Sequence, residues 1–176
     1  MTLEPMARPD AEQRGLGEVL ETSEHSGVPG ELFIRILAHV PGYAEAIHDA
    51  MRTSHVEGSV DHRLKEIIRI QLARTANDPY FAGLRSTRAL EEGLTEELID
   101  ACSGEFESDT RFSDAEKWAL RYAYLMYRSP GEIDSAFYDE GKRHFSEAQI
   151  MELGGMIAIH YGMQRFMATI PTEQLH

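Results

Sequence analysis

The sequence has 176 residues, of which 42% are hydrophobic and 27% are charged, values ordinary for one globular domain with its own core. Thirty acidic residues against 17 basic ones give a net charge of −13, which argues against nucleic-acid binding because phosphate backbones would be repelled. The single cysteine, Cys102, excludes an internal disulfide and a dithiol redox pair within one chain.

No apolar run reaches the roughly 18–20 residues that span a bilayer, and the first residues contain no apolar stretch of the kind found in secretory signals. We therefore expect a soluble, cytoplasmic protein with no membrane partner.

Residues 1–30 contain proline and glycine at short intervals, which predicts an N-terminal arm, with a short helix near 10–22, that stands apart from the core. From residue 31 onward apolar residues recur at helical spacing, and no segment alternates as a strand would. Residues 31–170 are therefore predicted to form a single all-α domain.

Start and stop signals divide this domain into helices. Asp78 is predicted to cap a helix, and Ser113 with Glu116 and Ser146 with Gln149 form two capping boxes. The predicted helices cover 31–39, 42–55, 61–76 and 79–92, followed by helices that begin near 95, 113, 129 and 147.

The predicted helix 61–76 has two faces. The core face carries Leu64, Ile67, Ile68, Gln71, Leu72 and Thr75. Glu66 lies on the other side with Ile70, which indicates a second packed surface such as a subunit contact. A carboxylate held there would have a raised pKa and could act as a general acid or base. The alternative, which spacing alone favours, is an exposed Glu66 paired with Arg69.

The next segment carries two arginines, Arg85 and Arg88, two turns beyond Asp78. One interpretation is that an arginine here holds a carboxylate or an enolate. The other is a surface arginine paired with Glu91 or Glu92, and spacing does not decide between them.

His160 lies in an apolar stripe of the last predicted helix. Such a histidine is more often a hydrogen-bonded core residue than a catalyst, although its pKa would suit proton transfer if it faced a cavity.

A metal site is the weaker alternative. His62 and Glu66, at i and i+4, would supply two ligands, but no complete metal-binding motif is present. His55 precedes a break at Gly58, so one helix cannot present both His55 and His62. Cys102 follows an apolar run and is predicted to pack as a small buried hydrophobe.

Residues 64–98 resemble the carboxymuconolactone decarboxylase and alkylhydroperoxidase D-like family, whose hallmark is a glutamate, then Cys-x-x-Cys, then histidine or Arg-Ser four residues later. Glu66 matches the glutamate. Asp78 and Phe81 stand where the two cysteines belong, and Arg85 stands at the histidine or arginine position, followed by Ser86. The later helices extend the likeness to about residues 31–170.

The resemblance implies an alkylhydroperoxidase D-like helical bundle that assembles as a trimer or hexamer, with sites near subunit interfaces. Thiol-dependent hydroperoxidase activity is not expected, because Asp78 and Phe81 cannot form or reduce a disulfide. Neither a metal nor another cofactor is predicted.

The leading hypothesis is a non-redox enzyme that performs acid–base chemistry on a small carboxylate- or carbonyl-bearing molecule by decarboxylation, isomerisation or elimination. Its catalytic candidates are Glu66, His160 and Asp78, and its substrate-binding candidates are Arg85, Tyr80 and Phe81. A non-catalytic ligand-binding or assembly relative is the second hypothesis. A metal-dependent enzyme that uses His62, Glu66 and either His55 or His160 is the third.

Overall fold

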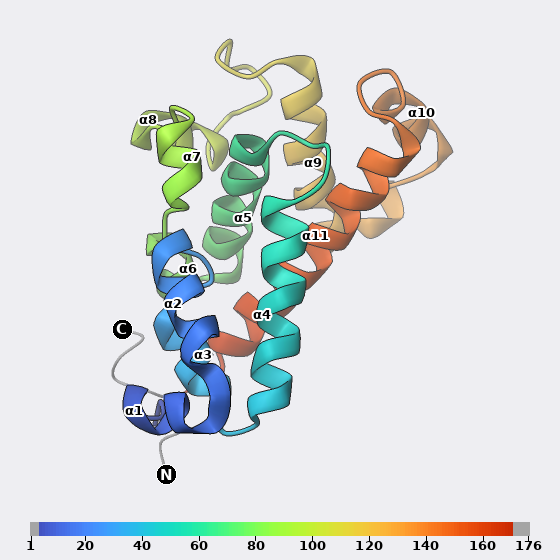
Figure 1. Ribbon diagram of the computed structural model, residues 1–176. Coiled ribbons are helices and arrows are strands. Elements are labelled where there is room, and N and C mark those ends of the chain that lie inside the picture. Colours follow the sequence, from blue (N-terminus) through green and yellow to red (C-terminus); the bar gives the residue numbers. More distant parts are fainter. Residues whose placement is uncertain (1–3, 171–176) are drawn as a thin grey trace.

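The computed structural model describes residues 4–170, and every regular element within this range is helical (Figure 1). The elements are α1 (Arg8–Ala11), the π-helical η1 (Glu12–Leu16), α2 (Gly17–Ser26), α3 (Glu31–Leu37), α4 (Pro41–Val56), α5 (His62–Ala76), α6 (Pro79–Gly83), α7 (Thr87–Glu91), α8 (Glu96–Cys102), α9 (Asp114–Arg128), the 3-10 helix η2 (Pro130–Glu132), α10 (Ser135–Gly141) and α11 (Glu147–Met167). The all-α prediction is confirmed. No helix among these residues is long and apolar enough to cross a membrane.

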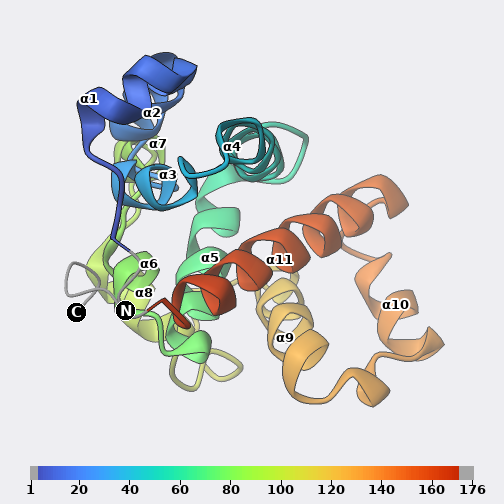
Figure 2. The same cartoon turned by 90° about the horizontal axis from the view of Figure 1, so that it is seen from below.

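Helix α5 is the centre of the domain, and the other helices are arranged around it (Figures 1 and 2). Twelve of its fifteen residues are buried, which leaves no face of the helix open to solvent. The second surface predicted for this helix exists, but α4, α6 and α11 of the same chain pack around α5. The face that carries Glu66 is therefore covered within one chain rather than by a partner subunit.

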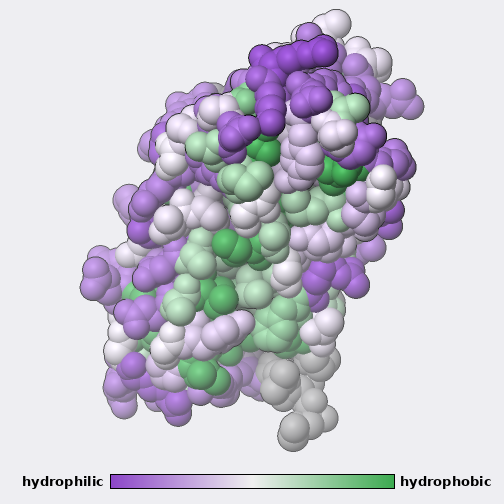
Figure 3. Space-filling view, turned by 90° about the vertical axis from the view of Figure 1, so that its right-hand side faces the viewer, coloured by the Kyte–Doolittle hydropathy of each residue, from purple (hydrophilic) through white to green (hydrophobic). Residues whose placement is uncertain are grey.

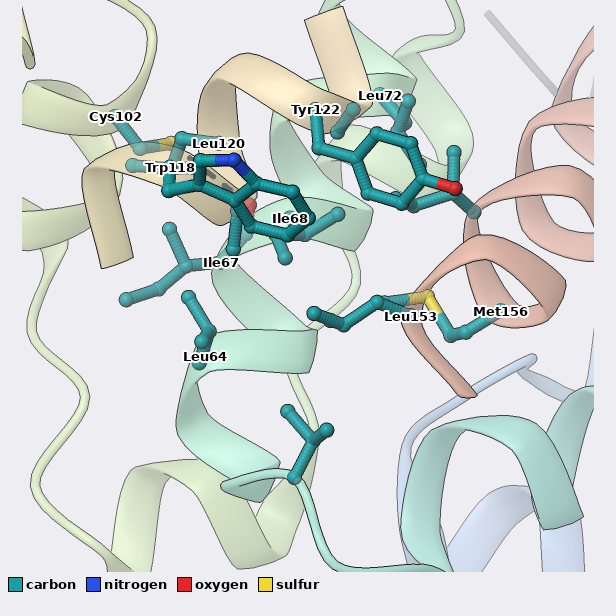
Figure 4. Packing of buried hydrophobic residues seen from close by; sticks show 14 of the residues in the cluster. Leu64, Ile67, Ile68, Leu72, Cys102, Trp118, Leu120, Tyr122, Leu153 and Met156 are labelled. Atoms are coloured by element: carbon teal, nitrogen blue, oxygen red, sulfur yellow. Dashed lines mark hydrogen bonds between the residues drawn. The ribbon is translucent and has the colours of Figure 1, made fainter. Parts of the chain in front are cut away.

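Two hydrophobic clusters flank α5. The first, part of which is shown in Figure 4, packs α5 against α8, α9, α10 and α11 and contains Trp118. The indole of Trp118 stacks on Tyr122 and Phe137. Cys102 belongs to this cluster and is fully buried, as predicted, and burial raises the pKa of its thiol. Gly141 lies directly against the Trp118 ring, where an added Cβ would come within 2.3 Å of a ring carbon.

The N-terminal segment corrects one expectation. Ala11, Leu16 and Leu20 are buried in the second cluster, together with residues of α3, α4 and α6. These side chains come from α1, η1 and α2, of which α2 packs against α3 and η1 packs against α4. The described part of residues 1–30 is therefore packed into the core, and the domain boundary at residue 30 stays a prediction.

The predicted helix 79–92 is interrupted. Helix α6 ends at Gly83, residues 84–86 are extended, and Ser86 caps α7 with its side chain. Arg69 binds the carbonyls of Phe81 and Leu84, and Glu66 accepts from the amide of Ser86. These bonds occupy backbone groups that a continuous helix would need, and sequence spacing does not reveal such long-range partners.

The helix predicted to begin near residue 129 begins later. Pro130 starts only the short η2, and α10 follows the cap at Asp134. The caps at Asp61, Asp78 and Thr95 and both capping boxes are present. Local signals therefore placed most helix starts correctly.

Candidate functional site

A buried ion pair between Glu66 and Arg69 lies at the centre of the candidate site. Nε and Nη2 of Arg69 donate to Oε2 and Oε1 of Glu66 at 2.7 and 2.8 Å. Arg69 also donates to the carbonyls of Phe81 and Leu84, at 2.7 and 2.8 Å, and the amide of Ser86 donates to Glu66 at 2.8 Å. Both side chains are fully buried. The expectation of an exposed Glu66 paired with Arg69 was therefore right about the partner and wrong about the exposure.

Three histidines surround this pair. His55, near the end of α4, places Nε2 3.0 Å from Oε2 of Glu66, at ion-pair distance but outside good hydrogen-bond alignment. The ring centroid of His55 lies 4.6 Å from that of His62 and 5.4 Å from that of His160. Helices α4, α5 and α11 thus each contribute one imidazole to a single cluster.

Hydrogen bonds fix the tautomer of His62. Its Nδ1 lies 3.0 Å from the carbonyl oxygen of His55, which can only accept, so Nδ1 carries the proton. The bare Nε2 then accepts from the hydroxyl of Ser86 at 2.8 Å. Ser86 is therefore tied to the site twice, through its amide to Glu66 and through its hydroxyl to His62.

The same reasoning fixes His160. Its Nε2 lies 3.2 Å from the carbonyl of Met51, so Nε2 carries the proton and Nδ1 presents a lone pair. Nδ1 is buried and has no hydrogen-bond partner within the described residues. An unpartnered buried acceptor is costly, which makes this nitrogen the most notable polar atom of the site.

Electrostatics separate the roles of these groups. Burial by itself would raise the pKa of Glu66, but attraction to Arg69, the hydrogen bonds from Arg69 and the contact with His55 outweigh it and hold that pKa far below its ordinary value. Burial lowers the pKa of His55 and, more strongly, that of His160. At neutral pH the Glu66 carboxylate therefore lies beside the neutral imidazoles of His55 and His160.

The cluster is closed in the single chain. His55, His62, Glu66, Arg69 and His160 are each at most 3% exposed within the described chain.

Solved structures with the same arrangement of helices identify the fold. The debrominase Bmp8, in a cysteine-to-alanine variant in complex with 2,3,4-tribromopyrrole, superposes with a TM-score of 0.83 at 23% identity over 100% of this chain and 92% of that chain. A peroxidase-related protein from Silicibacter sp. TM1040 gives 0.74 at 17% identity over 99% and 94% of the two chains. An alkylhydroperoxidase AhpD core protein from Ralstonia eutropha JMP134 gives 0.71 at 16% identity over 99% and 94%. The chain has the alkylhydroperoxidase D-like fold.

These superpositions establish the fold. No family model and no curated protein matches the sequence. The resemblance drawn from Glu66 and the segment that follows is therefore confirmed as a statement about the alkylhydroperoxidase D-like fold.

The two residues at the predicted thiol positions have structural contacts. Oδ1 of Asp78 accepts from the amide of Phe81, whereas Oδ2 is buried with no hydrogen-bond partner among the described residues. Burial raises the pKa of Asp78. Phe81 is fully buried and packs edge-on against Phe33. Neither side chain takes part in the histidine cluster.

Tyr80 and Arg85 also lie outside the cluster. The hydroxyl of Tyr80 donates to the carbonyl of Pro29 and accepts from the amide of Phe33, and burial raises the pKa of Tyr80 to about 12. Arg85 donates to both carboxylate oxygens of Glu96 at 2.8 and 2.9 Å. Arg85 is therefore a surface arginine in an ion pair, as the second interpretation held, but its partner is Glu96 and not Glu91 or Glu92.

Arg88 follows the same alternative, because it pairs with Glu92. Of the six predicted site residues, the structure therefore brings only Glu66 and His160 together.

The described residues contain no set of ligands that would support the metal hypothesis. Along residues 4–170 no group of three or more His, Cys, Asp and Glu side chains is arranged to hold a metal ion. The nitrogens of His62 are occupied by the carbonyl of His55 and the hydroxyl of Ser86 instead.

Sequence reasoning did not place Arg69 and Ser86 in one site with the histidines, and it named His55 only as an alternative ligand of the metal hypothesis. The signal for His55 was its i−7 spacing from His62 across a Gly58 turn with φ of +100°, which lets the chain reverse and bring the two rings together. Nothing in the local pattern revealed that Arg69 would be buried.

Proposed function

We propose that this chain is an enzyme that moves a proton on a small organic molecule, with His55 and His160 as bases and Glu66 as the residue that positions His55. The observation that supports the proposal is the cluster of three imidazoles around a buried ion pair. Burying these polar groups costs more free energy than an apolar core would at the same place. Buried groups with strongly shifted pKa values are concentrated at functional sites.

The roles differ from those expected from sequence. Glu66 is held ionised by Arg69 and is therefore a poor proton acceptor at neutral pH. Its negative charge instead favours a protonated His55 after proton transfer, because the two groups are 3.0 Å apart. Nδ1 of His160 is the lone pair with no competing partner among the described residues.

The ion pairs of the two arginines limit the charge that a substrate can carry. The four hydrogen bonds of Arg69 go to Glu66 and to two backbone carbonyls, and Arg85 is paired with Glu96. Neither cation is free to hold a substrate carboxylate. A neutral carbonyl compound or a small neutral ring fits better, and the ligand of the similarly folded Bmp8 variant, 2,3,4-tribromopyrrole, is a small ring of this kind.

The proposed step balances without an oxidant. A histidine base takes a proton from the carbon next to the carbonyl, and the electron pair of that C–H bond moves to form the enolate. Return of the proton at another carbon gives isomerisation, and loss of a leaving group with the electron pair gives elimination. Removal of bromine by reduction would need two electrons, and the single thiol, Cys102, is buried in the first hydrophobic cluster.

Substrate access requires a local opening. The connection 57–61 between α4 and α5 is held by Glu152, which accepts from the amides of Ser59 and Val60, and by Lys65, which binds the carbonyl of Glu57 and pairs with Glu152. Release of this connection would uncover the end of α4 that carries His55.

Exchange of carbon-bound hydrogen in D2O tests the proposal. Small ketones and heteroaromatic rings are incubated with the protein, and deuterium incorporation is followed by NMR. We expect incorporation that falls by about two orders of magnitude or more in His55→Asn and His160→Asn, in line with general acid–base catalysis. His144→Asn, at an exposed position, is the matched control. Equal incorporation in all four proteins would remove the histidines from the chemistry.

A non-catalytic relative is the second candidate, favoured by the closure of the site. If the buried cluster only stabilises the fold, Glu66→Gln will lower stability while small molecules leave the NMR signals of the histidine rings unchanged.

Assembly as a trimer or hexamer, implied by the resemblance, stays a prediction, and the outer face of α11 is its best candidate interface. Met151 is 64% and Phe166 41% exposed on this face, and an added Cβ at Gly155 or Gly162 would meet no atom of the described chain. Figure 3 shows hydrophobic side chains gathered on the side of the molecule where α4 and α11 lie. Helix-interior glycines that no contact within the chain explains fit the close approach of a second helix.

A further inference from the structure

A cavity between α2 and α4 lies apart from the histidine cluster. The two helices run side by side (Figures 1 and 2), and the cavity between them has a volume of about 420 Å³, within the range of small-molecule sites. Its polar wall is formed by Glu18, Thr22, Glu45, His48, Asp49 and Arg52.

His48 is the unusual member of this wall. It is only 3% exposed, and its Nδ1 lies 3.3 Å from Oδ1 of Asp49. Since the Asp49 carboxylate can only accept, Nδ1 carries the proton and Nε2 presents a lone pair. That nitrogen is buried and has no hydrogen-bond partner within residues 4–170. Burial also lowers the pKa of His48, which keeps the lone pair available at neutral pH.

The remaining charges of the cavity are mostly negative. Glu18 and Glu45 take part in none of the ion pairs formed within residues 4–170. The one cation of the wall, Arg52, is paired with Glu57 at 2.9 Å. The cavity therefore combines unneutralised carboxylates with a shielded acceptor nitrogen.

We propose that the cavity between α2 and α4 binds a small organic cation with N–H donors, such as a primary ammonium, through His48, Glu18 and Glu45. An ammonium group has three N–H donors, and these residues offer three acceptors. Its hydrogen bonds are about 2.8 Å long, whereas a metal needs ligands converging at about 2.0–2.6 Å. No such convergent ligand group occurs in the described chain.

The test compares three probes of graded chemistry by NMR titration of the whole chain at neutral pH. The n-butylammonium ion has charge and N–H donors, tetramethylammonium has charge alone, and n-butanol has neither the charge nor the N–H donors. We expect saturable shifts of residues on α2 and α4 with n-butylammonium and much weaker effects with the other two. Equal binding of tetramethylammonium, or no saturable binding of n-butylammonium, would overturn the proposal.

Variants locate the site. Glu18→Gln and Glu45→Gln change exposed positions that should not disturb folding, and each is expected to weaken n-butylammonium binding roughly tenfold. His48→Leu should do the same if it stays folded. Glu147→Gln removes the same charge at a different cavity, between α10 and α11, and should leave binding unchanged. A loss in Glu147→Gln equal to that in Glu45→Gln would show a general charge effect and refute the assignment.

Discussion

Arg69→Met is the substitution that most directly tests the central ion pair. The change keeps an unbranched side chain of similar length in the middle of α5 but removes the charge and all the donors. Four hydrogen bonds are lost, two to the carboxylate of Glu66 and one each to the carbonyls of Phe81 and Leu84. Glu66 then remains buried with only the amide of Ser86 and the His55 ring beside it.

The expected loss follows from this burial. Removing one partner of a fully buried pair costs about 3–5 kcal/mol, because the other charge is left uncompensated. With a urea m-value of roughly 2 kcal/mol per molar, the unfolding midpoint should fall by roughly 1.5–2.5 M. The double variant Glu66→Gln with Arg69→Met removes the stranded charge and keeps an acceptor for Ser86, so it should recover about 1–3 kcal/mol.

Urea unfolding followed by circular dichroism gives both numbers. The exposed pair of Arg88 and Glu92 is the matched control, with the same ion-pair chemistry at 2.7 Å, and Arg88→Met should cost less than about 1 kcal/mol. If Arg69→Met were no more costly than Arg88→Met, or if the double variant were less stable than Arg69→Met alone, the reasoning about the buried pair would be wrong.

Three further predictions address pH, packing and assembly. Burial lowers the folded-state pKa of His55 and His160, so the unfolded chain binds more protons than the folded chain in mild acid. The free energy of unfolding should therefore have its full value above about pH 6.5 and fall as the pH drops below that value. Urea midpoints measured across this pH range should fall less steeply for His160→Gln than for the unchanged protein. Gly141→Ala should lower the free energy of unfolding by about 1–3 kcal/mol, measured by urea unfolding, because the new methyl group overlaps the Trp118 ring. Phe166→Glu on the outer face of α11 should lower the molecular mass measured by sedimentation, and an unchanged mass would exclude this face as the interface.

Each of these has a control in the chain. His144→Gln changes an exposed histidine and should leave the pH dependence as it is. Gly131→Ala adds a methyl group where no atom lies within 4 Å, so a cost equal to that of Gly141→Ala would contradict the packing argument. Glu107→Gln, at an exposed position between α8 and α9, should leave the molecular mass measured by sedimentation unchanged.

The part of the structure that was predictable is local. Helix starts depend on side chains within three residues of the cap, so the caps at Asp78, Ser113 and Ser146 were predicted correctly. The interruption between α6 and α7 was missed because its cause, Arg69, lies 12 and 15 residues before the carbonyls that it binds.

The candidate site shows the same division. Glu66 was singled out from its position in a family-like pattern, and His160 from its apolar surroundings, and both lie in the histidine cluster. Arg85 was expected to face the substrate, but its partner is Glu96 on α8, beyond the intervening α7, and this pairing depends on how α8 folds back.

The sequence by itself determined that the chain is helical, where most helices begin, and that no pair of thiols is present. Only the tertiary structure decided that the face of α5 that carries Glu66 turns inward, that Glu66 is an ionised carboxylate held by Arg69, and that three imidazoles from three helices meet beside it. The reason is physical: caps and periodicity act over a few residues, whereas burial and charge pairing depend on which distant segments close over a side chain.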